Sequence, residues 1–331
     1  MSYKTSLACA SAFAAAAIFA GVGPASAHTI IGNRIFPATL AIDDPGVDDE
    51  LTIPTFAYSF NSTTTYPPMD GTQNYEFNLY YAKRITSDLQ VSIDSTFLHA
   101  VNPRANGWEG IETEVKDQIM VNTEHEFVVS LAVAEAWGAS GTPGIAPQYT
   151  TITPKAFIGK GFGDLENEWL RPFAVTGEID YDVPTVSNIY NNNILIQQNP
   201  TTLDYGFTIQ YSLNYMNGYV REVPEILRNL TLDIEAQFTT PVSNIGPSVL
   251  GSVPGTHETT GVIGPGIYYI AHDYQIGLYG AFPINEASGK HPGIMANVDF
   301  YLDDLFPNTL GKPIFGPEQS RAFDPWHAFP Q

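Results

Sequence analysis

Two neighbouring stretches between residues 74 and 100 alternate between apolar and polar side chains. The apolar side chains of each stretch share one parity along the chain: Tyr75, Phe77, Leu79 and Tyr81 in the first, and Leu89, Val91, Ile93 and Phe97 in the second. Successive side chains of a β-strand point to opposite faces of the sheet. Each stretch therefore predicts a strand with one apolar face and one polar face.

The longest alternating stretch covers residues 203–215, "LDYGFTIQYSLNY". At about 3.3 Å per residue, such a strand would run roughly 43 Å. This is long for a soluble β-sandwich, whereas a tilted transmembrane strand needs only about 9 to 11 residues. The length of the alternation therefore favours strands that cross a membrane.

The same alternation predicts about twelve strands. Numbered along the chain, the first, third, fifth and later odd connections between strands are mostly longer than the even ones. This bias is typical of outer-membrane barrels, whose outer loops are long and whose periplasmic turns are short. Two connections, 160–171 and 216–229, break the rule, and the second contains a predicted helical turn in "EVPEILRN". The predicted strands cover residues 51–60, 74–83, 89–99, 112–121, 126–136, 151–159, 172–181, 203–215, 230–239, 260–270, 274–282 and 292–302.

Three features favour an all-β fold with a single antiparallel transmembrane β-barrel, about 12 strands and periplasmic termini. Soluble sheets commonly carry lysine on their edge strands to prevent aggregation, but the polar faces here carry little lysine. A closed barrel has no edge strands and needs no such protection. One uninterrupted alternating chain is easier to place in one barrel than in a sandwich. Aromatic residues also lie near strand ends, as in the aromatic girdles at the two membrane surfaces: Tyr75, Tyr81, Tyr181, Tyr205, Tyr215, Tyr274 and Phe282.

In this barrel the apolar faces would contact lipid and the polar faces would line a wet lumen. Alternation alone also fits a secreted soluble β-sandwich that binds a ligand or partner, with the apolar faces packed inward. That binding module remains an alternative at this point.

The two ends of the chain differ in composition from the predicted barrel at 51–302. Lys4, an apolar run over 7–22 and the small residues Ala25 and Ala27 predict a signal peptide at 1–27, cut before His28. An uncleaved membrane anchor is the alternative. Residues 28–50 include the acidic "DDPGVDDE" and predict a solvated N-terminal arm or a partial plug, and residues 303–331 predict a C-terminal Pro-rich tail. The only cysteine, Cys9, lies within the signal peptide, so the mature chain would form no disulfide.

The charge of the chain excludes one class of partner and suggests a selectivity. Its net charge is −21, so it would repel nucleic acid. Most ionisable residues on the polar strand faces are carboxylates, which in a pore would favour cations. The alternative is that they only solvate a filled interior or pair with Lys116 and Lys155. The candidate lumen-lining residues are Glu76, Asp94, Glu112, Glu114, Lys116, Glu178, Asp180, Asp204, Asp233, Glu235 and Asp299.

Catalytic and cofactor motifs are not found in the sequence. None of the seven histidines lies in an H-E-x-x-H motif, and the chain has no G-x-S-x-G nucleophile motif. Both "EHE" at Glu124–Glu126 and "GKGFGD" at 159–164 predict turns, and "GKGFGD" lacks the Lys-Ser/Thr of a phosphate-binding loop. We therefore predict no catalytic residue, metal or cofactor, although a hydrolase embedded in the barrel wall remains an alternative.

Several short sequence segments resemble those of bacterial outer-membrane barrels. The segment "HPGIMANVDFYL" resembles the C-terminal assembly signal of these barrels at Gly293, Ala296, Val298 and Phe300, but it departs from that signal because the chain continues to residue 331. The phrases "GFGDLENEWLRPFAVTG" and "HEFVVSLAV" are similar to poorly characterised outer-membrane transporters, including those associated with aromatic-compound degradation. The resemblance implies a Gram-negative outer-membrane, porin-like protein that lets a small solute pass. Its partners would be outer-membrane lipid and the barrel-assembly machinery, and the resemblance supplies no functional residue.

Overall fold

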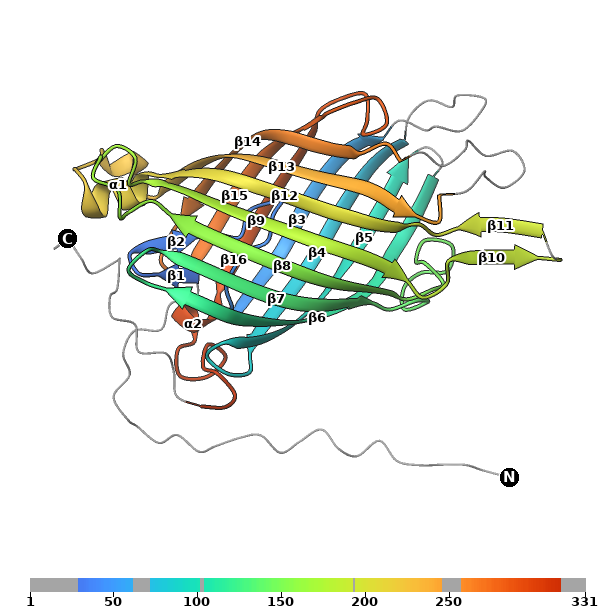
Figure 1. Ribbon diagram of the computed structural model, residues 1–331, viewed down its shortest axis with the longest axis horizontal. Coiled ribbons are helices and arrows are strands. Elements are labelled where there is room, and N and C mark those ends of the chain that lie inside the picture. Colours follow the sequence, from blue (N-terminus) through green and yellow to red (C-terminus); the bar gives the residue numbers. More distant parts are fainter. Residues whose placement is uncertain (1–28, 62–71, 102–103, 193, 246–256, 317–331) are drawn as a thin grey trace.

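Twelve antiparallel strands close into one β-barrel in the computed structural model (Figure 1), which confirms the predicted fold and strand count. The structure describes residues 29–61, 72–101, 104–192, 194–245 and 257–316, so the predicted signal peptide at 1–27 and the end of the tail at 317–331 lie outside the described residues. The barrel strands are β3 (Glu50–Asn61), β4 (Thr72–Arg84), β5 (Leu89–Val101), β6 (Arg104–Asn122), β7 (Phe127–Ala136), β8 (Thr151–Gly161), β9 (Phe173–Pro184), β12 (Thr201–Ser212), β13 (Leu230–Ser243), β14 (Thr260–Ile270), β15 (Tyr274–Pro283) and β16 (Gly293–Tyr301).

The strands follow one another around the barrel in chain order, and β16 pairs with β3 to close it. The one insertion is the hairpin of β10 (Asn188–Asn191) and β11 (Ile194–Gln198), which lies between β9 and β12 in the chain while those two strands pair directly. Closure leaves no barrel strand with an unpaired edge, so backbone groups in the wall are satisfied without water.

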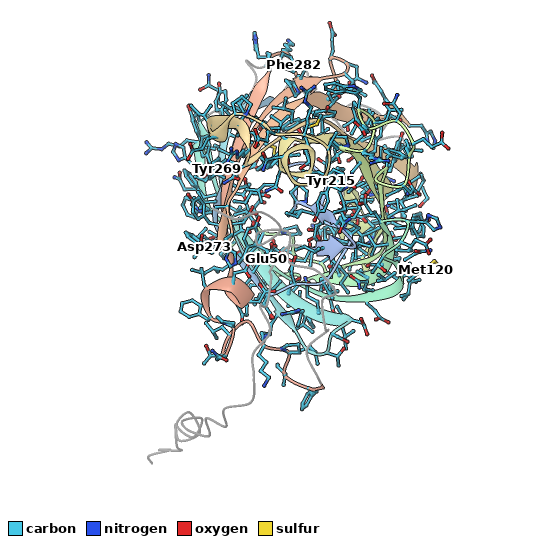
Figure 2. The ribbon with its side chains drawn as sticks, turned by 90° about the vertical axis from the view of Figure 1, so that its left-hand side faces the viewer. Glu50, Met120, Tyr215, Tyr269, Asp273 and Phe282 are labelled. Carbon is cyan, nitrogen blue, oxygen red and sulfur yellow. The ribbon has the colours of Figure 1, made fainter. Side chains whose placement is uncertain are left out.

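The exterior of the barrel is apolar. Figure 2 views the barrel from one end, with Glu50 and Tyr215 inside and Met120, Tyr269 and Phe282 at the periphery. A soluble β-sandwich would bury such side chains between its sheets, so that alternative is wrong. Each of the twelve strands exposes at least one large apolar side chain: Ile53, Phe77, Ile93, Val115, Leu131, Ile158, Ile179, Phe207, Ile234, Ile263, Ile276 and Ile294.

The two ends of the barrel carry connections of different length. Antiparallel neighbours place every second connection at the same end, and the short turns at 85–88, 123–126 and 271–273 share one end with the longer segments 162–172 and 213–229. The two exceptions predicted from the sequence therefore both lie at the short-turn end, which we call the inner end. The β10–β11 hairpin projects from the opposite, outer end (Figure 1).

Three short helices lie at the inner end. They are α1 (Leu213–Tyr219), the 3-10 helix η1 (Glu225–Leu227) and α2 (Leu302–Leu305), and η1 confirms the helical turn predicted in "EVPEILRN". Within the described residues, every helix is too short or too polar to span a bilayer.

Several predicted strand boundaries differ from the structure, and two of the differences have a visible cause. The strand predicted for 203–215 ends at Ser212, whose hydroxyl accepts a hydrogen bond from Tyr215 N at 3.1 Å and caps α1. Tyr215 is consequently a buried helical residue and not part of an aromatic girdle. The strand predicted for 112–121 begins earlier, at Arg104, because Val101 pairs with Arg104 across a narrow connection. Its first residues include Gly107 and Gly110, which hide the alternation.

Residues 29–49, which we call the interior segment, contribute the main apolar clusters inside the barrel. The segment contains the hairpin of β1 (Thr29–Ile31) and β2 (Arg34–Phe36). Ile31 and Phe36 pack with Val128 and Ala174 of the wall. A second cluster joins residues 40–42 to the inner faces of β14 and β15. The inner face of the wall is therefore partly apolar where it meets the segment.

Two inward-facing glycines make room for the interior segment. A Cβ atom on Gly206 would lie 2.2 Å from Cδ1 of Ile42, and one on Gly159 would lie 2.7 Å from Cγ of Pro45. Since real atoms do not approach so closely, larger residues here would push the segment away from the wall.

Candidate functional site: the barrel interior

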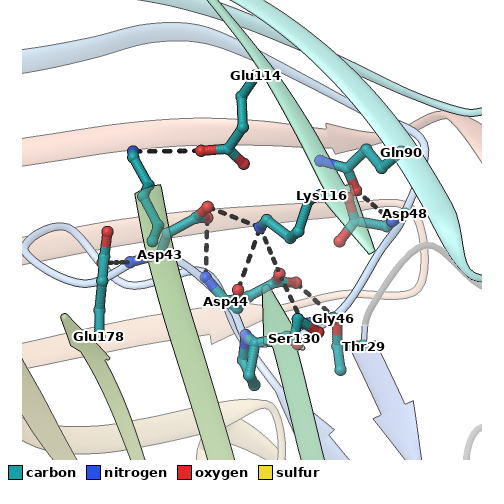
Figure 3. A network of polar contacts seen from close by, with 12 residues as sticks. Thr29, Asp43, Asp44, Gly46, Asp48, Gln90, Glu114, Lys116, Ser130 and Glu178 are labelled. Atoms are coloured by element: carbon teal, nitrogen blue, oxygen red, sulfur yellow. Dashed lines mark hydrogen bonds and ion pairs between the residues drawn. The ribbon is translucent and has the colours of Figure 1, made fainter. Parts of the chain in front are cut away.

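Lys116 of β6 holds the middle of the interior segment (Figure 3). Its Nζ lies 2.7 Å from Oδ2 of Asp43 and 3.2 Å from the carbonyl oxygen of Asp44, and the ammonium lies 4.7 Å from the centre of the Phe157 ring. Burial opposes ionisation of Asp43, but the Lys116 ammonium outweighs it and lowers the pKa of this carboxyl. Lys116, a candidate lumen-lining residue, is thus buried against the segment.

The other carboxylates of the acidic motif are also buried. Asp44 accepts hydrogen bonds from Thr29 Oγ1 at 2.8 Å and from Gly46 N at 3.2 Å. The backbone N–H of Asp48 donates to Oε1 of Gln90 at 2.8 Å. Burial, together with the nearby carboxylates of Asp44 and Glu50, raises the pKa of the Asp48 carboxyl well above its ordinary value.

The end of the interior segment is fixed at the start of the barrel wall. Asp49 is fully buried and accepts from Nε of Arg84 at 2.8 Å, and Nη2 of Arg84 also donates to Oδ2 of Asp303 at 3.2 Å. Arg84 thereby joins the segment, β4 and α2 through two carboxylates. Such a buried, hydrogen-bonded triad is costly to break because removing one member leaves a buried charge unpaired.

Arg34 fixes the β1–β2 hairpin to the turns of the inner end. Its Nε lies 3.2 Å from Oε2 of Glu126, its Nη1 donates to the Pro172 carbonyl at 3.0 Å, and its guanidinium lies 3.9 Å above the Tyr215 ring. The sequence predicts a turn at Glu124–Glu126, and the carboxylates of turns ordinarily face solvent. Glu126 is instead only 3% exposed, because Arg34 brings its carboxylate inward.

Alternation could not have identified Arg34, Glu126 or Tyr215. They lie in a short hairpin, a turn and a helix, and they meet only because the barrel brings these elements to one end. The only sequence signal was that the two long inner-end connections broke the length rule.

A cavity of about 330 Å³ lies between residues 38–43 of the interior segment and the barrel wall. Hydroxyl and amide side chains line it together with apolar side chains of residues 38–42, and Lys155 is the one Lys or Arg among the described residues that line it. Six of the candidate lumen-lining residues face it: Asp94, Glu112, Glu114, Glu178, Asp180 and Asp299. Two further carboxylates, Asp43 and Glu50, come from the interior segment and the first residue of β3.

Lys155 of β8 lies among three of the cavity carboxylates. Its Nζ is 3.2 Å from Oε2 of Glu114, 3.7 Å from Oε1 of Glu112 and 3.9 Å from Oδ2 of Asp180. The ammonium therefore screens this side of the cavity. Asp94, which pairs in register with Glu112, accepts from Asn78 Nδ2 at 3.1 Å, and Glu178 accepts from Asp43 N at 3.1 Å.

The remaining candidate residues do not line the cavity. Glu76 lies on β4, two residues from the cavity-lining Asn78 and on the same face, and Asp204 of β12 pairs in register with Asp180 of β9. Asp233 and Glu235 are buried on β13. Glu235 accepts hydrogen bonds from Ala41 N at 2.7 Å and from the Tyr268 hydroxyl, so it holds the interior segment in place.

Two histidines near the barrel rims form polar side-chain contacts, His125 exposed and His99 half-buried. His99 contacts Asn106, and Nδ1 of His125 lies 3.0 Å from Oδ2 of Asp164. In the described part of the chain, no three His, Cys, Asp or Glu side chains are arranged to hold a metal ion.

Comparison with known proteins yields likenesses of fold only. No protein-family model and no curated protein sequence matches the chain. Among solved structures, the NanC porin is similar with 8% identity and a TM-score of 0.46, over 75% of this chain and 98% of its own. The KdgM porin has 8% identity and a TM-score of 0.44, over 76% and 98%. LpxR from Salmonella typhimurium has 11% identity and a TM-score of 0.41, over 76% and 99%.

The apolar exterior and the closed antiparallel wall determine where the protein resides. A closed barrel satisfies every backbone group of its wall internally, and a band of exposed apolar side chains is stable only against lipid. Barrels of this kind occupy the bacterial outer membrane, and this chain is an outer-membrane β-barrel.

Proposed function

We propose that this barrel lets small solutes cross the outer membrane, as a channel or facilitated transporter with an acidic lumen that prefers cations and neutral polar molecules to anions. The observation that carries the proposal is the polar cavity inside an apolar-walled barrel, lined by eight carboxylates and one lysine. In a bore narrower than about two Debye lengths, roughly 16–20 Å at physiological salt, wall charges act on every passing ion. The link to aromatic-compound degradation remains a prediction from the resemblance, and we assign no catalytic role.

The interior segment occupies part of the bore. Residues 38–43 line one side of the cavity, and the β1–β2 hairpin is fixed to the inner-end turns by Arg34. A solute in the cavity must therefore pass the segment or displace it to reach the periplasm. This arrangement favours a facilitated or gated pathway over a permanently wide pore.

The test is charge selectivity in planar bilayers under a salt gradient. The variant Glu76→Gln, Asp94→Asn, Glu112→Gln removes three wall charges without removing a contact to the interior segment, whereas changes at Glu178 or Glu235 would also loosen that segment. We expect a cation-selective reversal potential for the native protein and a shift towards zero for the variant.

A matched control removes three exposed carboxylates from the inner-end turns and connections, Glu166→Gln, Glu168→Gln and Glu222→Gln. Its reversal potential should remain that of the native protein. Anion preference in the native protein, or equal shifts in both variants, would refute an acidic selectivity region. A complete lack of conductance would remove the channel function but not the barrel. All proteins should first be checked for the faster gel mobility of an unheated folded barrel.

A further inference from the structure

Glu50 differs from every other carboxylate of the cavity in having no partner. The others each lie within 4.0 Å of a donor, as Asp43 does with Lys116, Asp94 with Asn78, and Asp180 with Lys155. Glu50 is only 5% exposed and lines the cavity, yet its carboxylate takes part in no hydrogen bond or ion pair among the described residues. A buried carboxylate without a partner costs free energy that a bound cation would recover.

Asp299 of β16 lies next to Glu50 on the inner face. On the paired strands β3 and β16, Glu50 lies opposite Tyr301, and Thr52 lies opposite Asp299. Glu50 and Asp299 are therefore diagonal neighbours on the same face of the wall. Asp299 accepts from Gln275 Nε2 at 3.0 Å and from Asn297 Nδ2 at 2.6 Å. Both donors are neutral amides, so they orient Asp299 without cancelling its charge. Two carboxylates therefore face the cavity here, and neither forms an ion pair with a Lys, Arg or His of the described residues.

We propose that Glu50 and Asp299 form a binding subsite for the primary ammonium group of a small organic cation, whose body occupies the rest of the cavity. The cavity volume of about 330 Å³ is far larger than one inorganic ion needs. Its wall supplies hydrogen-bonding groups from Thr55, Asn78 and Gln237 for a polar ligand body. An ammonium has three donors and can bridge two carboxylates. The inference deepens the proposed function by naming the solute class.

Equilibrium binding to the full mature protein in detergent micelles tests the subsite. The probe is putrescine, a linear diamine, titrated calorimetrically at pH 7.5, with 1,4-butanediol as the uncharged analogue of the same length. We expect saturable binding of the diamine and none of the diol. Glu50→Gln should weaken diamine binding about tenfold or more, as expected for loss of a charged hydrogen bond. Glu135→Gln makes the same chemical change on β7 outside the cavity and should leave binding unaltered.

Three results would overturn the inference: no diamine binding, equal binding to Glu50→Gln and native protein, or displacement of the diamine by equimolar Mg²⁺ or Na⁺. If Glu50→Gln loses the gel mobility of a folded barrel, Asp299→Asn takes its place with the same expected loss. Binding requires no transport, so the two proposals can fail separately. Cation-selective conductance without diamine binding would refute only the subsite. Diamine binding without conductance would refute only the channel.

Discussion

At the scale of single residues, the interior is organised by which carboxylates have a cation and which do not. Asp43 is held ionised by Lys116, and Asp49 contacts the guanidinium of Arg84. Asp48 lies between them in sequence but faces only other carboxylates and a more distant lysine, so burial and its neighbours favour its protonated form. Identical side chains within one short motif thus carry opposite electrostatic roles.

Asp48→Asn should stabilise the protein at neutral and higher pH. The pKa of Asp48 is raised in the folded state relative to the ordinary Asp pKa near 4 in the unfolded chain. The native protein therefore loses stability as the pH rises from about 4 through the raised pKa of the folded state. Asparagine cannot ionise, so we expect a gain of about 1–3 kcal/mol at pH 8 that shrinks towards pH 4. The measurement is the urea midpoint of unfolding by tryptophan fluorescence between pH 4 and 9.

The exposed residue Asp117 provides the control, because Asp117→Asn changes the same charge outside the interior. It should shift the midpoint little at any pH. A gain for Asp48→Asn that is equally large at pH 4 and pH 8 would show that packing, not ionisation, is responsible.

At the scale of elements, the connections of unusual length at the inner end share one structural role, which is to pack around the β1–β2 hairpin. The segments 162–172 and 213–229 are longer than the other turns there, and both contact Arg34 of the β1–β2 hairpin, through the Pro172 carbonyl and the Tyr215 ring. The turn at 123–126 supplies the third contact through Glu126. The excess length of these connections is explained by their packing around the hairpin.

Arg34→Met should release the hairpin from the inner end. The substitution keeps most of the apolar stem but leaves the buried Glu126 carboxylate without its ion pair, a loss of about 3–5 kcal/mol. We expect the Asp-X bonds of residues 43–49 to become accessible to an Asp-specific protease in the folded barrel, and any single-channel conductance to increase. The readouts are peptide mapping by mass spectrometry and planar-bilayer recording.

Arg171→Met is the matched control, because Arg171 is half-buried at the same end and its Nε donates to the carbonyl of Leu165 and not to Glu126. It should leave both readouts at native levels. Unchanged protease protection in Arg34→Met would mean that Lys116, Arg84 and the apolar clusters hold the interior segment without the hairpin.

At the scale of the whole molecule, the wall reverses the usual arrangement of a soluble protein. Large apolar side chains cover the outside of all twelve strands, while ionisable groups and a small apolar core fill the inside. Such a surface is compatible with lipid alone. We expect the chain to reach the outer membrane through the periplasm, guided by the export signal predicted for residues 1–27.

The mature protein should begin at His28. The apolar run at 7–22 and the small residues Ala25 and Ala27 predict cleavage there. Intact-mass measurement of protein purified from membranes of the native host is expected to show loss of residues 1–27. A species that retains Met1 would indicate an anchor and would contradict this route.

The sequence alone determined the class of fold. Alternation is a local property, since each strand needs only its own residues to place apolar and polar groups on opposite faces. Twelve strands, the loop asymmetry and the lipid-facing parity could therefore be predicted, although the strands at Arg104 and Ser212 were misjudged where glycines or a helix cap interrupted the pattern.

Only the tertiary structure decided what fills the barrel and which carboxylates remain free. The partners of Arg34, Lys116 and Glu235 are far away in sequence, and closure of the wall brings them together. Parity can place Glu50 and Asp299 on inward faces, but it cannot show that one received donors and the other did not. That difference depends on three-dimensional packing of the interior segment, which no local pattern encodes.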